Sequence, residues 1–169
     1  MFARKPVLRG AALAAAISVF IVALPAAIDT REPAPKFRAK TLDGELFSNE
    51  SIRGKVVLLQ FWATWCGFCR RDQPAVDAIV RDFESKGLVV LAVNVGESKS
   101  KVKRYLQDSP RACKIVTTED TNLAALFAAH AYPLYVLIDR DGMIAGTQRG
   151  AGGELALRDL LTRAGLNSE

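Results

Sequence analysis

Two cysteines separated by two residues are the most chemically suggestive feature of the sequence. Cys66 and Cys69 enclose a glycine and a phenylalanine. Such a pair can close a small disulfide, or it can supply two of the ligands of a zinc ion. A tetrahedral zinc site needs two further ligands, and the remaining cysteine and the single histidine, Cys113 and His130, are far apart in sequence. The spacing therefore favours a redox-active dithiol over a metal site.

The neighbouring residues predict different roles for the two thiols. Apolar residues at three- and four-residue spacing predict a helix over residues 66–85. Cys66 would then lie at the helix N-terminus, where free N–H groups and the positive end of the helix dipole favour a thiolate. Arg70 and Arg71 add positive charge one turn later. We therefore expect Cys66 to attack a disulfide and Cys69 to resolve the mixed disulfide.

Length, charge and cysteine number exclude several other classes of protein. The chain has 169 residues, a formal net charge of +5 and three cysteines. A chain of this length can bury a core without disulfide cross-links. The basic cluster at residues 99–104 is flanked by acidic residues, which is typical of a solvated helix face and not of a nucleic-acid site. No dinucleotide or P-loop motif is present, so we predict no cofactor.

The N-terminus predicts a membrane segment. Three basic residues precede residues 10–28, a run of nineteen residues without charge. A cut after Ala27 or Ala26 would place Pro25 or Leu24 at the third position before it, so neither site is a clean signal-peptidase site. We favour a signal anchor over residues 1–30, with a cleaved signal peptide as the alternative. In either case the domain at residues 31–169 would lie outside the cytoplasm.

The pattern of apolar residues predicts an α/β domain. Residues 37–47 contain Asp-Gly between two extended runs, which is a hairpin signal. Residues 56–62 form an almost continuous apolar run, typical of a central strand buried on both faces. The remaining segments predict strands at residues 88–95, 115–116, 134–138 and 143–145, and helices at residues 98–107, 121–130 and 155–164. This order predicts a mixed central sheet with a parallel half, an antiparallel half and helices on both faces.

The stretch from Gly54 to Pro74, with Trp62-Ala63-Thr64-Trp65-Cys66-Gly67-Phe68-Cys69 at its centre, resembles the active site of the thioredoxin superfamily. It is most similar to the membrane-anchored, extracytoplasmic TlpA/ResA-like branch, and the resemblance extends over almost all of residues 33–165. It implies a thioredoxin-like fold with an N-terminal β-hairpin extension.

The resemblance also implies roles for individual residues. Cys66 and Cys69 would be the nucleophilic and resolving cysteines. Pro133 would be the family's cis-proline opposite the dithiol, and Tyr132 would shape the substrate groove. Asp72 would be an acidic group that relays protons to Cys69, or else a solvent-facing charge in the first turns of the helix.

Other positions depart from the family pattern or have structural interpretations. Phe68 stands where proline is common, and Gln60 replaces a buried acidic or amide residue, so the redox potential need not match that of thioredoxin. Trp62 is interpreted as a core residue, whereas Trp65 beside Cys66 is expected to cover the active-site surface and contact substrate.

The last two candidate residues have structural interpretations. Cys113 is expected to be a buried free thiol, although a regulatory disulfide stays open in an oxidising compartment. His130 is expected near a helix C-terminus without a catalytic role.

Together these features predict a thiol–disulfide oxidoreductase that acts on protein disulfides or dithiols. We favour a reductase, which would need electrons from a membrane donor such as a thiol-reductant transporter. The alternatives are a disulfide oxidant or isomerase, and a copper(I)-handling protein that uses the soft thiolates. A thiol peroxidase would instead carry a lone reactive cysteine. The physiological substrate, the reduction potential and the oligomeric state do not follow from the sequence.

Overall fold

The computed structural model describes residues 31–167, so the predicted signal anchor at residues 1–30 lies outside the described residues. Its centre is one seven-stranded sheet in the order β2-β1-β5-β4-β3-β6-β7. The strands are β1 (Arg38–Thr41), β2 (Leu46–Ser48), β3 (Val56–Trp62), β4 (Leu88–Asn94), β5 (Lys114–Thr121), β6 (Leu134–Ile138) and β7 (Ile144–Arg149). The order of strands and helices along the chain matches the predicted order.

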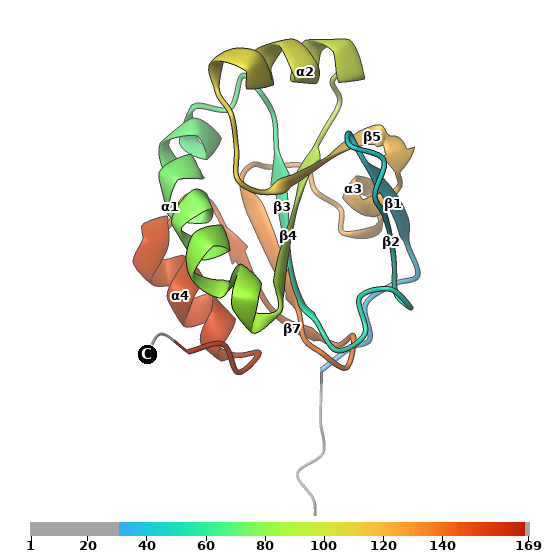
Figure 1. Ribbon diagram of the computed structural model, residues 1–169, viewed down its shortest axis with the longest axis vertical. Coiled ribbons are helices and arrows are strands. Elements are labelled where there is room, and N and C mark those ends of the chain that lie inside the picture. Colours follow the sequence, from blue (N-terminus) through green and yellow to red (C-terminus); the bar gives the residue numbers. More distant parts are fainter. Residues whose placement is uncertain (1–30, 168–169) are drawn as a thin grey trace, which may run out of the picture.

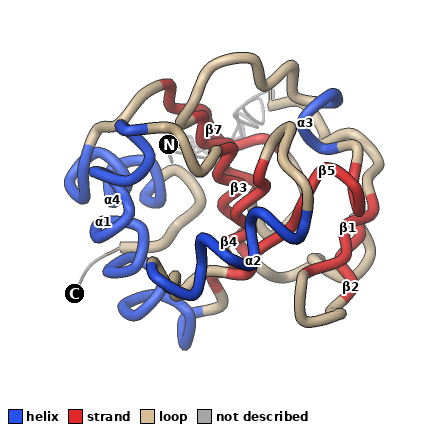
Figure 2. The backbone as a smooth tube through the Cα atoms, turned by 90° about the horizontal axis from the view of Figure 1, so that it is seen from above, coloured by secondary structure: helices blue, strands red, loops and turns tan. Residues whose placement is uncertain are grey.

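Helices cover both faces of the sheet, as the sequence predicts (Figures 1 and 2). They are α1 (Gly67–Phe83), the short 3-10 helix η1 (Glu84–Lys86), α2 (Lys99–Asp108), α3 (Leu123–Leu126) and α4 (Gly153–Thr162). Helices α1 and α4 lie side by side on one face, and α3 lies on the other. Within residues 31–167, no helix is long and apolar enough to cross a membrane.

Strand β3 is the centre of the molecule and leads directly to the cysteines. All seven of its residues are buried, which confirms the predicted central strand. It pairs parallel with β4 and antiparallel with β6, so the predicted division into parallel and antiparallel halves meets at this strand. The C-terminal end of β3 therefore has backbone support on both sides.

Alternating side chains of β3 build two cores. Leu58 and Trp62 belong to the core beneath α1 and α4. Leu59 and Phe61 point to the opposite face and pack with α3 and the N-terminal hairpin. This alternation follows from the two-residue repeat of a strand, and it explains why the run lacks a polar face.

The predicted N-terminal hairpin is confirmed and forms one edge of the sheet. Strands β1 and β2 pair antiparallel, and Gly44 in the connecting turn has a φ of +92°. Strand β1 also pairs with β5, which explains why β5 is longer than the strand predicted at residues 115–116. Residues 114–117 of β5 pair with β4, and Val116 and Thr121 pair with β1 of the hairpin.

The helix predicted over residues 121–130 is present but much shorter, as α3 over Leu123–Leu126. Helix α3 ends at Leu126, and Ala128 takes the left-handed conformation with a φ of +45°. The N–H groups of Ala128 and Ala129 donate to the carbonyls of Ala125 and Ala124, which is the Schellman pattern of a helix end. Glycine usually marks this position, so an alanine gave no stop signal in the sequence.

Candidate active site

The Cys66–Cys69 pair lies where the central strand turns into the first long helix. The two sulfurs form a disulfide with an S–S distance of 2.06 Å and a Cα–Cα distance of 5.2 Å. Cys66 is the N-cap residue of α1, and Cys69 lies in its first turn. The N–H of Cys66 donates to the carbonyl of Ala63 at 3.1 Å, which closes the turn between β3 and α1.

The two sulfurs have different surroundings. The backbone N–H of Cys69 donates to Sγ of Cys66 at 3.1 Å. Cys66 keeps 5% of its surface exposed, and Cys69 keeps none. An N–H at a helix start stabilises negative charge on the sulfur that it faces. The arrangement therefore favours charge on Cys66, the more accessible of the two.

The predicted cis-proline is present beside the dithiol. The Tyr132–Pro133 peptide bond is cis, and the carbonyl of Pro133 accepts from the N–H of Gly150 at 2.8 Å. Phe68, Tyr132 and Pro133 line one groove of about 360 Å³. The fold thus brings residues about 65 positions apart in sequence to the same surface.

Two aromatic side chains mark the surface around Cys66. Trp65 is 63% exposed, and its ring meets that of Tyr132 edge-on, with the centroids 5.9 Å apart. Phe68 is 60% exposed. Trp62, by contrast, is fully buried in the core. Large exposed apolar side chains beside a reactive group are typical of a surface that binds a partner.

Glu97 supports the turn before the dithiol, and the sequence analysis missed it. Its carboxylate accepts from the N–H and hydroxyl of Thr64, at 2.7 and 2.6 Å, and from the amide of Asn94 at 2.8 Å. Nζ of Lys101 lies 2.7 Å from Oε1, the oxygen that also accepts from the Thr64 hydroxyl. Burial alone would raise the pKa of Glu97, but hydrogen bonds from Lys101, Thr64 and Asn94 outweigh it and lower the pKa to about 2. Glu97 is therefore an ionised anchor for this turn.

Asp72 is buried, so the interpretation as a solvent-facing charge is wrong. It is 3% exposed. Its carboxylate accepts from the hydroxyl of Tyr135 at 2.6 Å and from the N–H of Gly153 at 2.8 Å. Gly153 is the first residue of α4, where an anion is favoured by the helix dipole. Asp72 thus joins α1, β6 and α4, one helical turn after Cys69.

Tyr135 extends this buried polar chain to Gln60 and Arg111. The amide of Gln60 donates to the hydroxyl of Tyr135 at 3.3 Å, and Arg111 donates to the Gln60 carbonyl at 3.5 Å. Burial and the bond to Asp72 raise the pKa of Tyr135, so its hydroxyl stays protonated and acts as a donor. A phenol inside the apolar run of β6 needs a buried hydrogen-bond partner. The position of Tyr135 in that run is therefore the sequence signal for this buried polar chain.

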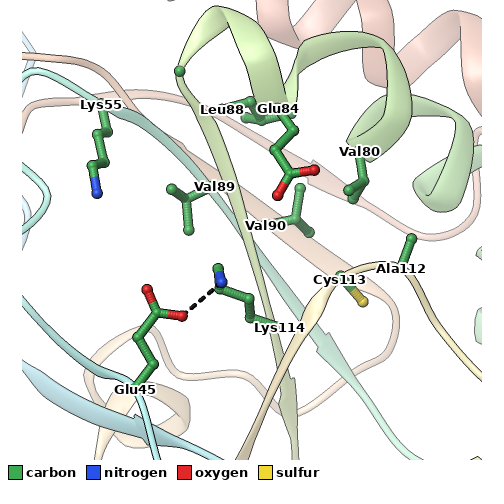
Figure 3. A pocket seen from close by; sticks show the side chains of 11 residues that line it. Glu45, Lys55, Val80, Glu84, Leu88, Val89, Val90, Ala112, Cys113 and Lys114 are labelled. Atoms are coloured by element: carbon green, nitrogen blue, oxygen red, sulfur yellow. Dashed lines mark hydrogen bonds and ion pairs between the residues drawn. The ribbon is translucent and has the colours of Figure 1, made fainter. Parts of the chain in front are cut away.

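Cys113 lies just before β5, whose first residue, Lys114, pairs with Leu91 in the middle of β4. It is a buried free thiol, as the sequence predicts, and it lines a pocket formed at the start of β4 and the end of α1. Figure 3 shows Cys113 beside Ala112 on the pocket wall, and across the pocket Lys114 pairs with Glu45 at 2.6 Å. Burial raises the pKa of the Cys113 thiol to about 11. This thiol is therefore held in its protonated form.

His130 and the possible metal ligands are the remaining candidate groups within residues 31–167. His130 is exposed and stands outside any helix, because α3 ends at Leu126; its predicted place near a helix C-terminus is therefore wrong. In this described part of the chain, no three histidine, cysteine, aspartate or glutamate side chains gather in an arrangement that could hold a metal ion.

Comparisons with known proteins agree with this geometry. Residues 30–147 match the model of the AhpC/TSA family. The thioredoxin-like protein YneN of Bacillus subtilis is 34% identical over 119 residues, which are 69% of each chain. The thiol-disulfide oxidoreductase ResA of Geobacillus thermodenitrificans is 30% identical over 118 residues, 70% of this chain and 68% of that one.

A solved structure supports the same placement. It is provisionally named thiol:disulfide interchange protein DsbE, from Chlorobium tepidum, and it is 27% identical with a TM-score of 0.71. The match covers 80% of this chain and 97% of that one. The resemblance drawn from the active-site stretch is thereby confirmed, and the chain belongs to the AhpC/TSA family of thioredoxin-like proteins, among its ResA-like thiol–disulfide oxidoreductases.

Proposed function

We propose that this thiol–disulfide oxidoreductase reduces protein disulfides outside the cytoplasm, with Cys66 as the attacking thiol. The observation that carries the proposal is the place of Cys66, which caps the N-terminus of α1 and faces the N–H of Cys69. A thiolate at a helix start is a good nucleophile and a good leaving group. Both properties serve thiol–disulfide exchange.

The reaction oxidises the dithiol to a disulfide in two exchange steps, and a separate electron donor restores the dithiol. The Cys66 thiolate attacks one sulfur of a substrate disulfide, a mixed disulfide forms, and the other substrate sulfur leaves as a thiolate. Cys69 then attacks Cys66, which releases the second substrate thiol and leaves the disulfide seen in the structure. Two electrons and two protons pass to the substrate. A dithiol donor in the membrane, such as a thiol-reductant transporter, would return them.

The surrounding residues have proposed roles in the same reaction. Tyr132, Pro133 and Trp65 form the surface beside Cys66 on which a substrate polypeptide would bind. Asp72 would exchange a proton with Cys69 as the mixed disulfide resolves. Its hydrogen bonds from Tyr135 and Gly153 hold the carboxylate in one place.

The proposed location rests on the sequence, and the proposed direction rests on the chemistry of the compartment. Three basic residues and an uncharged apolar run precede the domain, which is the pattern of a signal anchor that keeps its basic end in the cytoplasm. A cleaved signal peptide would release the domain into the periplasm. In either case the dithiol would work in a compartment that already has strong oxidants, where a reductase adds the missing activity.

The reduction potential of the chain tests the direction of electron flow. Equilibration with glutathione or dithiothreitol buffers, followed by quantification of the oxidised and reduced forms, gives this potential. A value near about −270 mV or lower supports a reductase, whereas a value near about −120 mV would overturn it in favour of an oxidant.

A membrane-impermeant maleimide tests the location. Bacterial spheroplasts that express the full chain are treated with reductant and then with the reagent. The proposal expects labelling of Cys66 in intact spheroplasts. Labelling that appears only after lysis would place the domain in the cytoplasm and contradict the proposal.

A further inference from the structure

The groove beside the dithiol carries an unbalanced positive charge. Eight residues line it, and two of them, Arg71 and Arg149, are arginines, whereas none is acidic. Both arginines are exposed. Arg71 comes from the first turns of α1, and Arg149 is the last residue of β7. Two guanidinium groups therefore stand on walls of the groove that come from separate elements.

Two carboxylates that lie close to the groove residues in sequence are held by other partners. Asp72 follows Arg71 in sequence, but its carboxylate is buried against Tyr135 and Gly153. Glu154, just beyond the groove, pairs with Arg158 at 2.6 Å. Among the ion pairs of residues 31–167, none involves either groove arginine. The positive charge is thus available to a molecule that binds in the groove.

The floor of the groove is apolar and aromatic. Phe68 is 60% exposed, and the guanidinium of Arg71 stacks over its ring with the carbon 4.8 Å from the centroid. Stacking orients the planar guanidinium while its N–H groups stay free for a carboxylate. Tyr132 and Pro133 complete the surface next to the cysteines. An apolar floor with oriented guanidinium groups fits an apolar segment that carries a carboxylate.

We propose that Arg71 and Arg149 select protein disulfides in which an aspartate or glutamate stands within a few residues of the cysteine that Cys66 attacks. The occupant of the groove is an extended polypeptide whose carboxylate pairs with these arginines while its apolar side chains cover Phe68. Arginine binds carboxylates through two parallel N–H bonds, so the groove discriminates by charge as well as by shape. This inference rests on the proposed exchange at Cys66 and adds the class of substrate to it.

Matched peptides test the substrate class. Two disulfide-bonded peptides differ only in a glutamate or a glutamine next to the cysteine, and the reduced full-length chain reduces each of them. We expect kcat/KM to be about threefold to tenfold higher for the glutamate peptide at low ionic strength. Since these charges are exposed, the ratio should fall toward one in about 0.5 M salt.

Charge-reversed variants assign the preference to the groove. In Arg71→Glu/Arg149→Glu the ratio of the two kcat/KM values should invert. Lys103→Glu/Arg104→Glu removes the same charge from α2, away from the groove, and should leave the ratio as in the natural chain. Equal inversion in both double variants would show a general charge effect and overturn the assignment to Arg71 and Arg149.

The outcomes separate this inference from the proposed function. If both peptides are reduced at equal rates at every salt concentration, exchange at Cys66 stands and the charge selection fails. If the reduced chain reduces neither peptide nor a general protein disulfide such as insulin, the proposed reductase function fails, and the substrate class fails with it.

Discussion

Cys66 and Cys113 are the same chemical group in two different parts of the sheet. They are almost equally buried, with 5% and 7% of their surfaces exposed. Cys66 follows the C-terminal end of β3, whereas Cys113 precedes β5, whose first residue pairs with Leu91 in the middle of β4. Burial alone therefore does not decide which thiol is reactive.

The difference lies in what each sulfur faces. Sγ of Cys66 accepts an N–H at the start of a seventeen-residue helix. Cys113 lies just before a strand, and burial outweighs Arg111 and the hydrogen bond from Gln73 and raises its pKa to about 11. The place of Cys66 at a helix start thus separates a redox thiol from an inert one.

Serine substitutions should show the largest difference between the two cysteines. Cys66→Ser should abolish reduction of insulin disulfides, because the attacking sulfur is gone. Cys113→Ser should keep activity within about twofold, since a buried protonated thiol takes no part in exchange. Comparable losses in the two variants would show that Cys113 belongs to the redox centre.

Alkylation rates measure the difference in reactivity between the two thiols directly. At pH 7 only on the order of one Cys113 thiol in ten thousand is ionised, because its pKa is about 11. We expect iodoacetamide to modify Cys66 of the reduced chain at least about 100-fold faster, as followed by mass spectrometry. Between about pH 7 and pH 10 the rate at Cys113 should rise about tenfold per pH unit. A fast, pH-independent reaction at Cys113 would contradict its assigned environment.

Glu97 is the carboxylate that supports the turn before Cys66, and its loss should destabilise the fold. Glu97→Gln turns an amide NH₂ toward donors of Thr64 and Asn94, so we expect about 2 kcal/mol less stability near neutral pH. The folded pKa of about 2 lies below the ordinary value of 4.5. The stabilisation is therefore complete above about pH 4.5 and is lost as the pH falls toward about 2. Urea unfolding at several pH values should show this dependence in the natural chain and not in Glu97→Gln.

Glu45, which lines the same pocket as Cys113, should contribute least to stability. Glu45 pairs with Lys114 at 2.6 Å, and both side chains are more than a third exposed. Exposed pairs contribute about 0.2–1 kcal/mol, so Glu45→Gln should shift the free energy of unfolding by about 0.5 kcal/mol or less. A loss of stability as large as that of Glu97→Gln would contradict the difference between these two carboxylates.

The sequence predicted the sheet well, because its strands are long apolar runs. Residues 56–62 and 134–138 carry their burial in their composition, and the order of elements follows from it. The end of α3 was not predictable, because Ala128 takes a conformation that glycine usually marks. The length of β5 depends on pairing with β1, which is a contact between segments far apart in sequence.

The site was predicted where its chemistry is local. Cys66 and Cys69 share one turn, so their spacing is visible in the sequence. The burial of Asp72 depends on Tyr135 from β6 and on Gly153 from α4, and no local pattern reports such a contact. Glu97 was interpreted only as the flank of a basic cluster. Its hydrogen bonds to Thr64 require the parallel pairing of β3 with β4.

Trapping of the mixed disulfide tests the central claim most directly. Cys69→Ser removes the resolving thiol, so a substrate disulfide attacked by Cys66 should stay attached to the chain. The adduct is isolated without reductant, digested and mapped by mass spectrometry. We expect a substrate cysteine linked to Cys66, with Cys113 unmodified. An adduct at Cys113, or no adduct in a folded Cys69→Ser chain, would contradict it.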